Sequence, residues 1–104
     1  MKVTMGFDQL ADALGHQARR QILVELMEHN PVSESGLEGS GVSGIELIHS
    51  HLPKLDEMDY IVWDRESQTI MKGPIWEEIE PVVRLLRDNP ERIPIDTFQC
   101  TKRS

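Results

Sequence analysis

Apolar residues recur at helical spacing in the first third of the chain. A stripe with one apolar residue in every four runs through Leu10, Leu14, Ala18, Ile22 and Leu26, and Leu23 and Met27 widen it. Gly15 interrupts the stripe, so we expect a short helix from Asp8 to Leu14 and a longer one from His16. Asn30-Pro31 is a typical helix end, because proline cannot continue a helix.

Residues 43–57 predict a second amphipathic helix. Ser43 and Glu46 have the spacing of a capping box, in which the Ser side chain accepts a backbone N–H of the first turn. Val42 and Leu47 occupy the two positions of a hydrophobic staple. The predicted apolar face consists of Ile45, Ile48, Leu52 and Leu55, and the side toward solvent carries Glu46, His49, Ser50 and Lys54.

The pattern changes to that of a β-hairpin after this helix. Residues 60–63 are apolar, residues 64–67 form a polar turn, and residues 68–71 alternate between polar and apolar side chains. A helix followed by a two-stranded hairpin is the arrangement of a winged helix-turn-helix. We therefore expect an α+β winged helix-turn-helix fold, with residues 60–71 as the wing.

A last helix is predicted for residues 74–88. Its apolar face would consist of Ile75, Ile79, Val82, Val83 and Leu86, and Asn89-Pro90 would end it. Pro81 lies inside this pattern and should either kink the helix or mark its true start, because it removes one backbone hydrogen bond.

The chain is expected to form one domain. We assign residues 1–7 to an N-terminal arm, residues 8–88 to the folded domain and residues 89–104 to an irregular tail, in which Ile93, Ile95 and Phe98 dock on the body. Residues 31–44 are rich in Gly and Ser, and glycines disfavour helix, so this segment allows a single helical turn at most.

The net negative charge of the chain argues against a nucleic acid as its partner. The chain of 104 residues carries a formal net charge of −7, whereas nucleic-acid binders tend to be basic. Its acidic, Lys-poor composition is compatible with a high-salt cytoplasm, where the screening length falls to about 3 Å at 1 M salt. No apolar run is long enough for a membrane span, and the N-terminus lacks the apolar stretch of a signal peptide. We therefore expect a cytoplasmic protein with no membrane partner.

Two stretches resemble a known family. The run from Phe7 to Leu23 resembles the opening helix of ArsR-like winged-helix regulators, in which a leucine, a short break, an arginine and Ile-Leu follow one another. Residues 50–55 (Ser-His-Leu-Pro-Lys-Leu), followed by Met58-Asp59-Tyr60-Ile61, are similar to that family's recognition helix and its entry into the wing. The His-Leu-Pro-Lys-Leu form is similar to small winged-helix proteins of salt-loving archaea. The resemblance covers residues 7–88.

The resemblance implies a dimeric, DNA-binding transcriptional regulator. Residues 43–57 would enter the major groove of double-stranded DNA, and residues 60–71 would lie on the flanking backbone. The candidate DNA contacts are His49, Ser50, Pro53, Lys54, Arg65 and Lys72. Arg65 has the strongest case, because a guanidinium on a hairpin turn reaches a phosphate or the minor groove. A homodimer would form through the last helix, with the first helix as a further candidate contact. The interface residues would be Ile75, Trp76, Ile79, Val82, Val83 and Leu86, since aromatic residues are enriched at interfaces.

The sequence gives no support for catalysis, a cofactor or a metal. It lacks a P-loop, a His-Glu-x-x-His motif and a Ser or Cys in a nucleophile context. His49 and His51 are two residues apart, so they do not share a helix face, and no nearby Cys completes a tetrahedral set. We therefore expect no enzyme activity, no cofactor and no metal site.

A second interpretation remains open at this point. The chain would then be a winged-helix module that has lost DNA binding and docks another protein. The acidic charge, the few cations on the predicted DNA-facing helix and the Gly-rich residues 31–44 favour this alternative.

Overall fold

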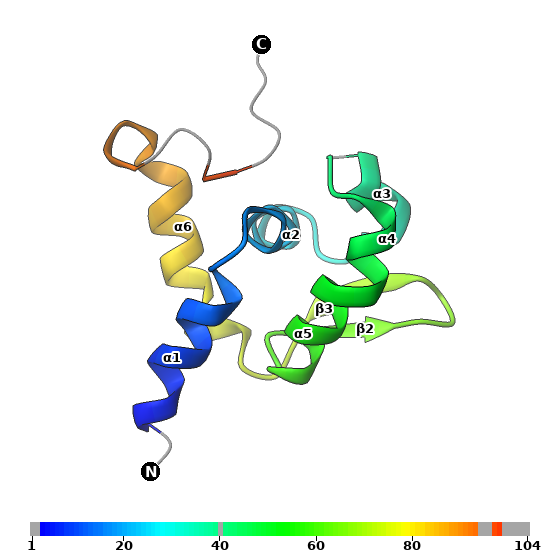
Figure 1. Ribbon diagram of the computed structural model, residues 1–104, viewed down its shortest axis with the longest axis horizontal. Coiled ribbons are helices and arrows are strands. Elements are labelled where there is room, and N and C mark those ends of the chain that lie inside the picture. The colour runs from blue at the N-terminus through cyan, green and yellow to red at the C-terminus, as the bar shows by residue number, and fades with distance from the viewer. Residues whose placement is uncertain (1–2, 40, 94–96, 99–104) are drawn as a thin grey trace.

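Helices surround a small antiparallel sheet in an α+β architecture (Figure 1). The computed structural model describes residues 3–39, 41–93 and 97–98. In chain order the elements are α1 (Val3–Ala13), α2 (Gln17–Glu28), β1 (Val32–Ser33), α3 (Glu34–Gly39), α4 (Gly44–Glu46), the π-helical turn η1 (Leu47–His51), α5 (Leu52–Glu57), β2 (Ile61–Asp64), β3 (Thr69–Lys72), the 3-10 turn η2 (Trp76–Glu78), α6 (Glu80–Asp88) and the 3-10 turn η3 (Pro90–Arg92). Within this described part, none of the helices is long and apolar enough to cross a membrane.

Helix α2 occupies the centre of the molecule. In Figure 1 it is seen almost end-on, with α1 and α6 on one side and α3, α4 and α5 on the other. Ile22, Leu23 and Leu26 of α2 are fully buried and form the middle of the core. This confirms the apolar stripe predicted from the sequence. Because these side chains are central, elements from both ends of the chain pack against α2.

The sheet has three strands in the order β1-β3-β2, so the expectation of a two-stranded hairpin was incomplete. β1 adds to the hairpin by pairing Val32 with Ile70 of β3. The hairpin itself is confirmed, with its strands shifted by one residue from the predicted ranges. Asp64 shapes the turn, because its Oδ1 accepts the backbone N–H groups of Glu66 at 3.1 Å and Ser67 at 3.4 Å.

Gly15 breaks the first helical segment as predicted, but α1 begins at Val3 and not at Asp8. Residues 3–7, expected as an arm, therefore belong to the helix. Two arginines hold the corner between α1 and α2 by donating to the carbonyl groups at the end of α1. Arg19 donates to Asp12 O at 2.8 Å and to Ala13 O at 3.2 Å, and Arg20 donates to Leu14 O at 2.6 Å.

The predicted helix 43–57 forms, but as a split helix made of α4, η1 and α5 (residues 44–57). Leu52 N–H donates to Leu47 O, five residues earlier, which is the spacing of a π turn. Pro53 follows directly. Its ring would clash with the carbonyl of His49 in a regular α-helix, and it has no N–H to donate, so a wider turn accommodates it.

The π turn changes which side chains face the core. Ile45, predicted to be buried, is 76% exposed, whereas Leu47 is fully buried and His51 is 3% exposed. Leu52 and Leu55 are buried as expected. Ser43 is the N-cap residue, but its side chain makes no capping hydrogen bond, so the capping box was wrong.

The last helix also packs differently from the expectation. Pro81 lies in the first turn of α6 and marks its true start, one of the two outcomes predicted. Trp76, Ile79 and Val83 are buried in the chain's own core, so they are not available as a dimer surface; Ile75, Val82 and Leu86 are half-buried. The reason is that α6 lies against α2, which the local pattern of α6 does not reveal. In the tail, Phe98 packs on the core as expected, and Ile95 lies outside the described residues.

The packing of the split helix predicts a large effect of truncating Leu52. Because Leu52 is fully buried, we expect Leu52→Ala to lower the free energy of unfolding by about 2–5 kcal/mol in urea denaturation. Ile45→Ala is the matched control on the same element, and we expect it to change stability by less than about 0.5 kcal/mol. Equal losses in the two variants would show that the helix does not face the core as described.

Candidate nucleic-acid interface

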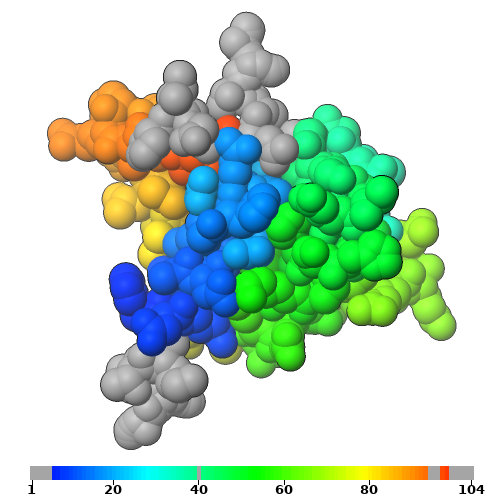
Figure 2. All heavy atoms as spheres, in the orientation of Figure 1, coloured from blue at the N-terminus to red at the C-terminus, as the bar shows by residue number. Residues whose placement is uncertain are grey.

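The split helix leaves one side free. His49 and Ser50 are exposed, together with Ile45, and Pro53 and Lys54 are half-buried. Figure 2 shows the atoms of this segment in green, as a continuous surface that leads to the yellow-green hairpin at the edge of the molecule. The structure therefore places four of the predicted DNA contacts on one element, beside the predicted wing.

Arg65 is presented by a well-supported hairpin. Its guanidinium carbon lies 4.3 Å from the ring centroid of Trp63, within the range of a cation–π contact. Trp63 is itself held, because its Nε1 donates to Glu34 Oε2 at 2.8 Å. Glu34 belongs to α3, so this hydrogen bond ties α3 to the hairpin. Arg65 therefore stays exposed, while its contact with the Trp63 ring restrains the position of its guanidinium.

The other two predicted cations are engaged with carboxylates. Lys54 Nζ lies 3.0 Å from Asp12 Oδ2 at the end of α1. Lys72 Nζ lies 3.9 Å from Glu80 Oε1, and 5.4 Å from the ring centroid of Trp76. Ion pairs that remain accessible to solvent are weak, so a phosphate can compete for either lysine, but each lysine then leaves an uncompensated carboxylate behind. The electrostatic attraction for DNA is therefore small on this face.

Three residues from separate parts of the chain meet behind this face. His16, Glu46 and His51 each offer a ligand atom, and these atoms lie within 4.8 Å of one another. His49 and His51, considered together in the sequence, are separated by the helix. His16 could not be expected beside His51, because it is far away in the sequence; it serves as the N-cap of α2 by accepting Ala18 N–H at Nδ1, 3.0 Å away.

His51 has unusual surroundings for a histidine. Burial lowers its pKa below the usual value near 6.5, and the neighbouring His16 and Arg19 lower it further, while Glu46 acts in the opposite direction. Its Nδ1 is 3.5 Å from Arg19 Nη1, and its ring centroid is 4.5 Å from that of His16. The ring of His51 is therefore neutral at pH 7.

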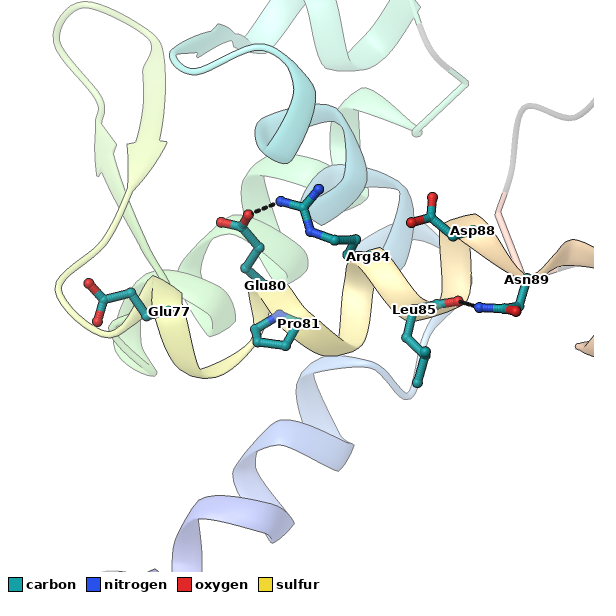
Figure 3. A pocket seen from close by; sticks show the side chains of 7 residues that line it. All are labelled: Glu77, Glu80, Pro81, Arg84, Leu85, Asp88 and Asn89. Atoms are coloured by element: carbon teal, nitrogen blue, oxygen red, sulfur yellow. Dashed lines mark hydrogen bonds and ion pairs between the residues drawn. The ribbon is translucent and has the colours of Figure 1, made fainter.

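A second surface lies on the outer side of α6. An open groove of about 490 Å³ is lined by Glu77, Glu80, Pro81, Arg84, Leu85, Asp88 and Asn89. Figure 3 shows Pro81 and Leu85 on one side of the helix, while Glu80 and Arg84 form an ion pair on the other. Leu85 is 63% exposed. With three carboxylates and one arginine, this groove does not suit a phosphate, and its chemistry fits a protein surface better.

Comparisons with known proteins do not assign the chain to a family. No family model matches it, and neither does a curated protein or a solved structure.

The lowered pKa of His51 predicts a specific dependence of stability on pH. Below pH 6.5 the unfolded chain protonates this histidine more readily than the folded chain, so the free energy of unfolding falls as the pH drops. We expect the loss between pH 7.5 and pH 5 to be smaller in His51→Gln than in the wild type, as measured by urea denaturation at each pH. Identical slopes in the two proteins would contradict the burial of a neutral His51.

Proposed function

We propose that the chain is a winged helix-turn-helix protein that binds double-stranded DNA in transcriptional control. In this proposal α3 and the split helix form the helix-turn-helix, the exposed side of the split helix lies in the major groove, and the hairpin β2–β3 contacts the flanking backbone. The observation that carries the proposal is the free face with His49 and Ser50 beside a hairpin whose turn presents Arg65.

The order of elements supports this assignment. A short strand precedes α3, a short connection joins α3 to the split helix, and the two hairpin strands follow and complete a sheet with that first strand. In winged-helix proteins this order puts a recognition helix and a wing on the same side of the molecule. The hydrogen bond between Trp63 and Glu34 is consistent with it, because it couples the bracing helix to the wing.

The contacts available on this face have a definite chemistry. His49 and Ser50 supply hydrogen-bonding groups for base edges, and Pro53 supplies an apolar contact. Arg65, Lys54 and Lys72 are the candidate phosphate contacts. Three phosphates per chain correspond to a salt slope of about −2.7 in log Kobs against log salt, which is shallow for a DNA-binding protein.

We propose a homodimer whose contact differs from the one expected from the sequence. A symmetric pair reads two half-sites spaced by a helical turn of DNA. Since Trp76, Ile79 and Val83 are internal, we place the contact on the outer side of α6, where Leu85 and Pro81 are exposed.

A second candidate function rests on one observation. Ile45 is 76% exposed near the start of the split helix, on the face assigned to DNA. A large exposed aliphatic residue is typical of a protein-docking surface. In this alternative the same face binds a protein partner, and the acidic charge of the chain is no obstacle.

The test begins with selection of duplexes from a random DNA pool by the purified full chain, followed by affinity measurements on the selected duplex at several salt concentrations. We expect Arg65→Glu to weaken binding by about ten-fold or more, because it places a negative charge beside a phosphate. Asp12→Asn should strengthen binding, because Lys54 then contacts a phosphate without leaving an uncompensated carboxylate behind. Arg92→Glu is the control: it makes the same charge change at an exposed arginine on η3, outside both this face and the α6 groove, and should leave the affinity unchanged.

Other results would decide against DNA. No enrichment of any duplex, or equal losses in Arg65→Glu and Arg92→Glu, would contradict the proposal. If a protein partner is instead captured from lysate, and Ile45→Glu abolishes that capture while Arg65→Glu does not, the docking function is supported.

A further inference from the structure

The cluster of His16, Glu46 and His51 joins two parts of the fold. His16 lies at the corner between α1 and α2, Glu46 ends α4, and His51 ends the π turn η1. Glu46 and His51 are five residues apart, a spacing that puts them on different sides of an α-helix. The π turn, whose hydrogen bonds join residues five apart, is wider than an α-helical turn and brings them closer together, and His51 Nε2 lies 3.8 Å from Glu46 Oε1.

A buried nitrogen of His51 is left without a partner. Nε2 of His51 has no hydrogen bond within the described part of the chain, although the residue is 3% exposed. The distance of 3.8 Å to Glu46 is too long for one. Buried polar atoms are nearly always paired, so an exception calls for an explanation. Nε2 is directed into the cluster, which suggests that its partner is a ligand held by the three residues.

We propose that His16, Glu46 and His51 bind a divalent transition metal ion, with Zn²⁺ the best fit. Two imidazoles and one carboxylate form a ligand set that Zn²⁺ uses, with a fourth position left to water. Imidazole nitrogens suit Zn²⁺, Co²⁺, Ni²⁺ and Cu²⁺, and they exclude Mg²⁺ and Ca²⁺, which take oxygen ligands. His16 and Glu46 are exposed, so the ion has a route from solvent and an open coordination position.

The geometry requires only small adjustments. Zinc bonds of 2.0–2.2 Å in a tetrahedral site place neighbouring ligand atoms about 3.4 Å apart. The pair between His51 and Glu46 is close to this separation, and the exposed side chains of His16 and Glu46 are free to close the rest.

One neighbour opposes the ion. Arg19 is the nearest cation, with Nη1 3.5 Å from His51 Nδ1. When the metal takes Nε2 of His51, the ring proton sits on Nδ1, and this contact with Arg19 must open. Arg19 keeps its hydrogen bonds to Asp12 O and Ala13 O, and Asp12 Oδ1, 3.8 Å away, offsets its charge. The bound ion would link the split helix to the start of α2. The proposed metal site does not rest on the proposed DNA binding.

The experiment titrates the metal-free full chain with ZnCl2 by calorimetry, and with Co²⁺ while the visible absorption is recorded. All proteins carry Cys100→Ser, which removes the single thiol of the chain. We expect saturable one-to-one binding, a Co²⁺ spectrum of low coordination number, and a rise in melting temperature with Zn²⁺, because the ion binds the folded state.

Three variants locate the site. Glu46→Gln removes the carboxylate and should weaken Zn²⁺ binding by about ten-fold or more. His16→Ser removes the imidazole but keeps a residue favoured at an N-cap, so the chain should still fold, and it should lose the Co²⁺ spectrum. His49→Gln is the matched control, because His49 is exposed on the same split helix and outside the cluster. Circular dichroism confirms the folding of each variant.

Two outcomes would overturn the proposal. One is the absence of saturable Zn²⁺ binding by the wild-type chain. The other is binding that His49→Gln reduces as much as Glu46→Gln and His16→Ser do, which would show that the ion associates with exposed histidines in general.

Discussion

The structure depends on how the backbone passes Pro53. A proline inside a helix removes a donor and crowds the carbonyl four residues earlier, and here the chain responds with a π turn over residues 47–51. This turn rotates the first part of the split helix relative to the second. Leu47 and His51 consequently face the core with Leu52 and Leu55, while Ile45 and His49 face solvent.

Both candidate sites follow from this rotation. The side of the split helix that it frees is the surface we assign to DNA. The side that it turns inward brings His51 to Glu46 and to His16. Several carboxylates near the candidate interface have partners. Asp12 pairs with Lys54, Glu80 pairs with Lys72, and Glu34 accepts the Trp63 ring N–H. These ion pairs occupy two of the three candidate phosphate contacts and leave the net charge of −7 unchanged, so Arg65 is the main source of attraction for DNA on this face.

Elements with a long, regular period could be predicted from the sequence. The stripe of α2, the break at Gly15 and the hairpin with its turn at Asp64 could be predicted, because each depends on residues close together in the chain. For Pro81 the sequence left two outcomes open, and the structure shows that it marks the start of α6. β1 was not, since two residues in a Gly- and Ser-rich segment show no alternation, and only pairing with β3 defines them.

The errors have two causes. Assigning faces with a constant helical period fails across a π turn, so Ile45 was placed inside and the inward position of His51 was missed. The residues predicted for a dimer surface were placed outside because the local pattern of α6 does not show its packing on α2, which buries Trp76, Ile79 and Val83. A histidine at the N-cap position before α2 was the one signal in the sequence for the metal cluster, and it gains meaning only when the fold brings His51 beside it.

The most direct measurement of the central claim is thiol labelling of the split helix, which reports orientation and not function. In a Cys100→Ser background, Ile45→Cys and Leu47→Cys are each introduced, and their labelling rates are measured under native conditions. Rapid labelling at position 45 with strong protection at position 47 is the result that the π turn predicts. Protection at position 45 with rapid labelling at position 47 would mean that the helix is regular and faces the other way, and the account of both sites would be contradicted.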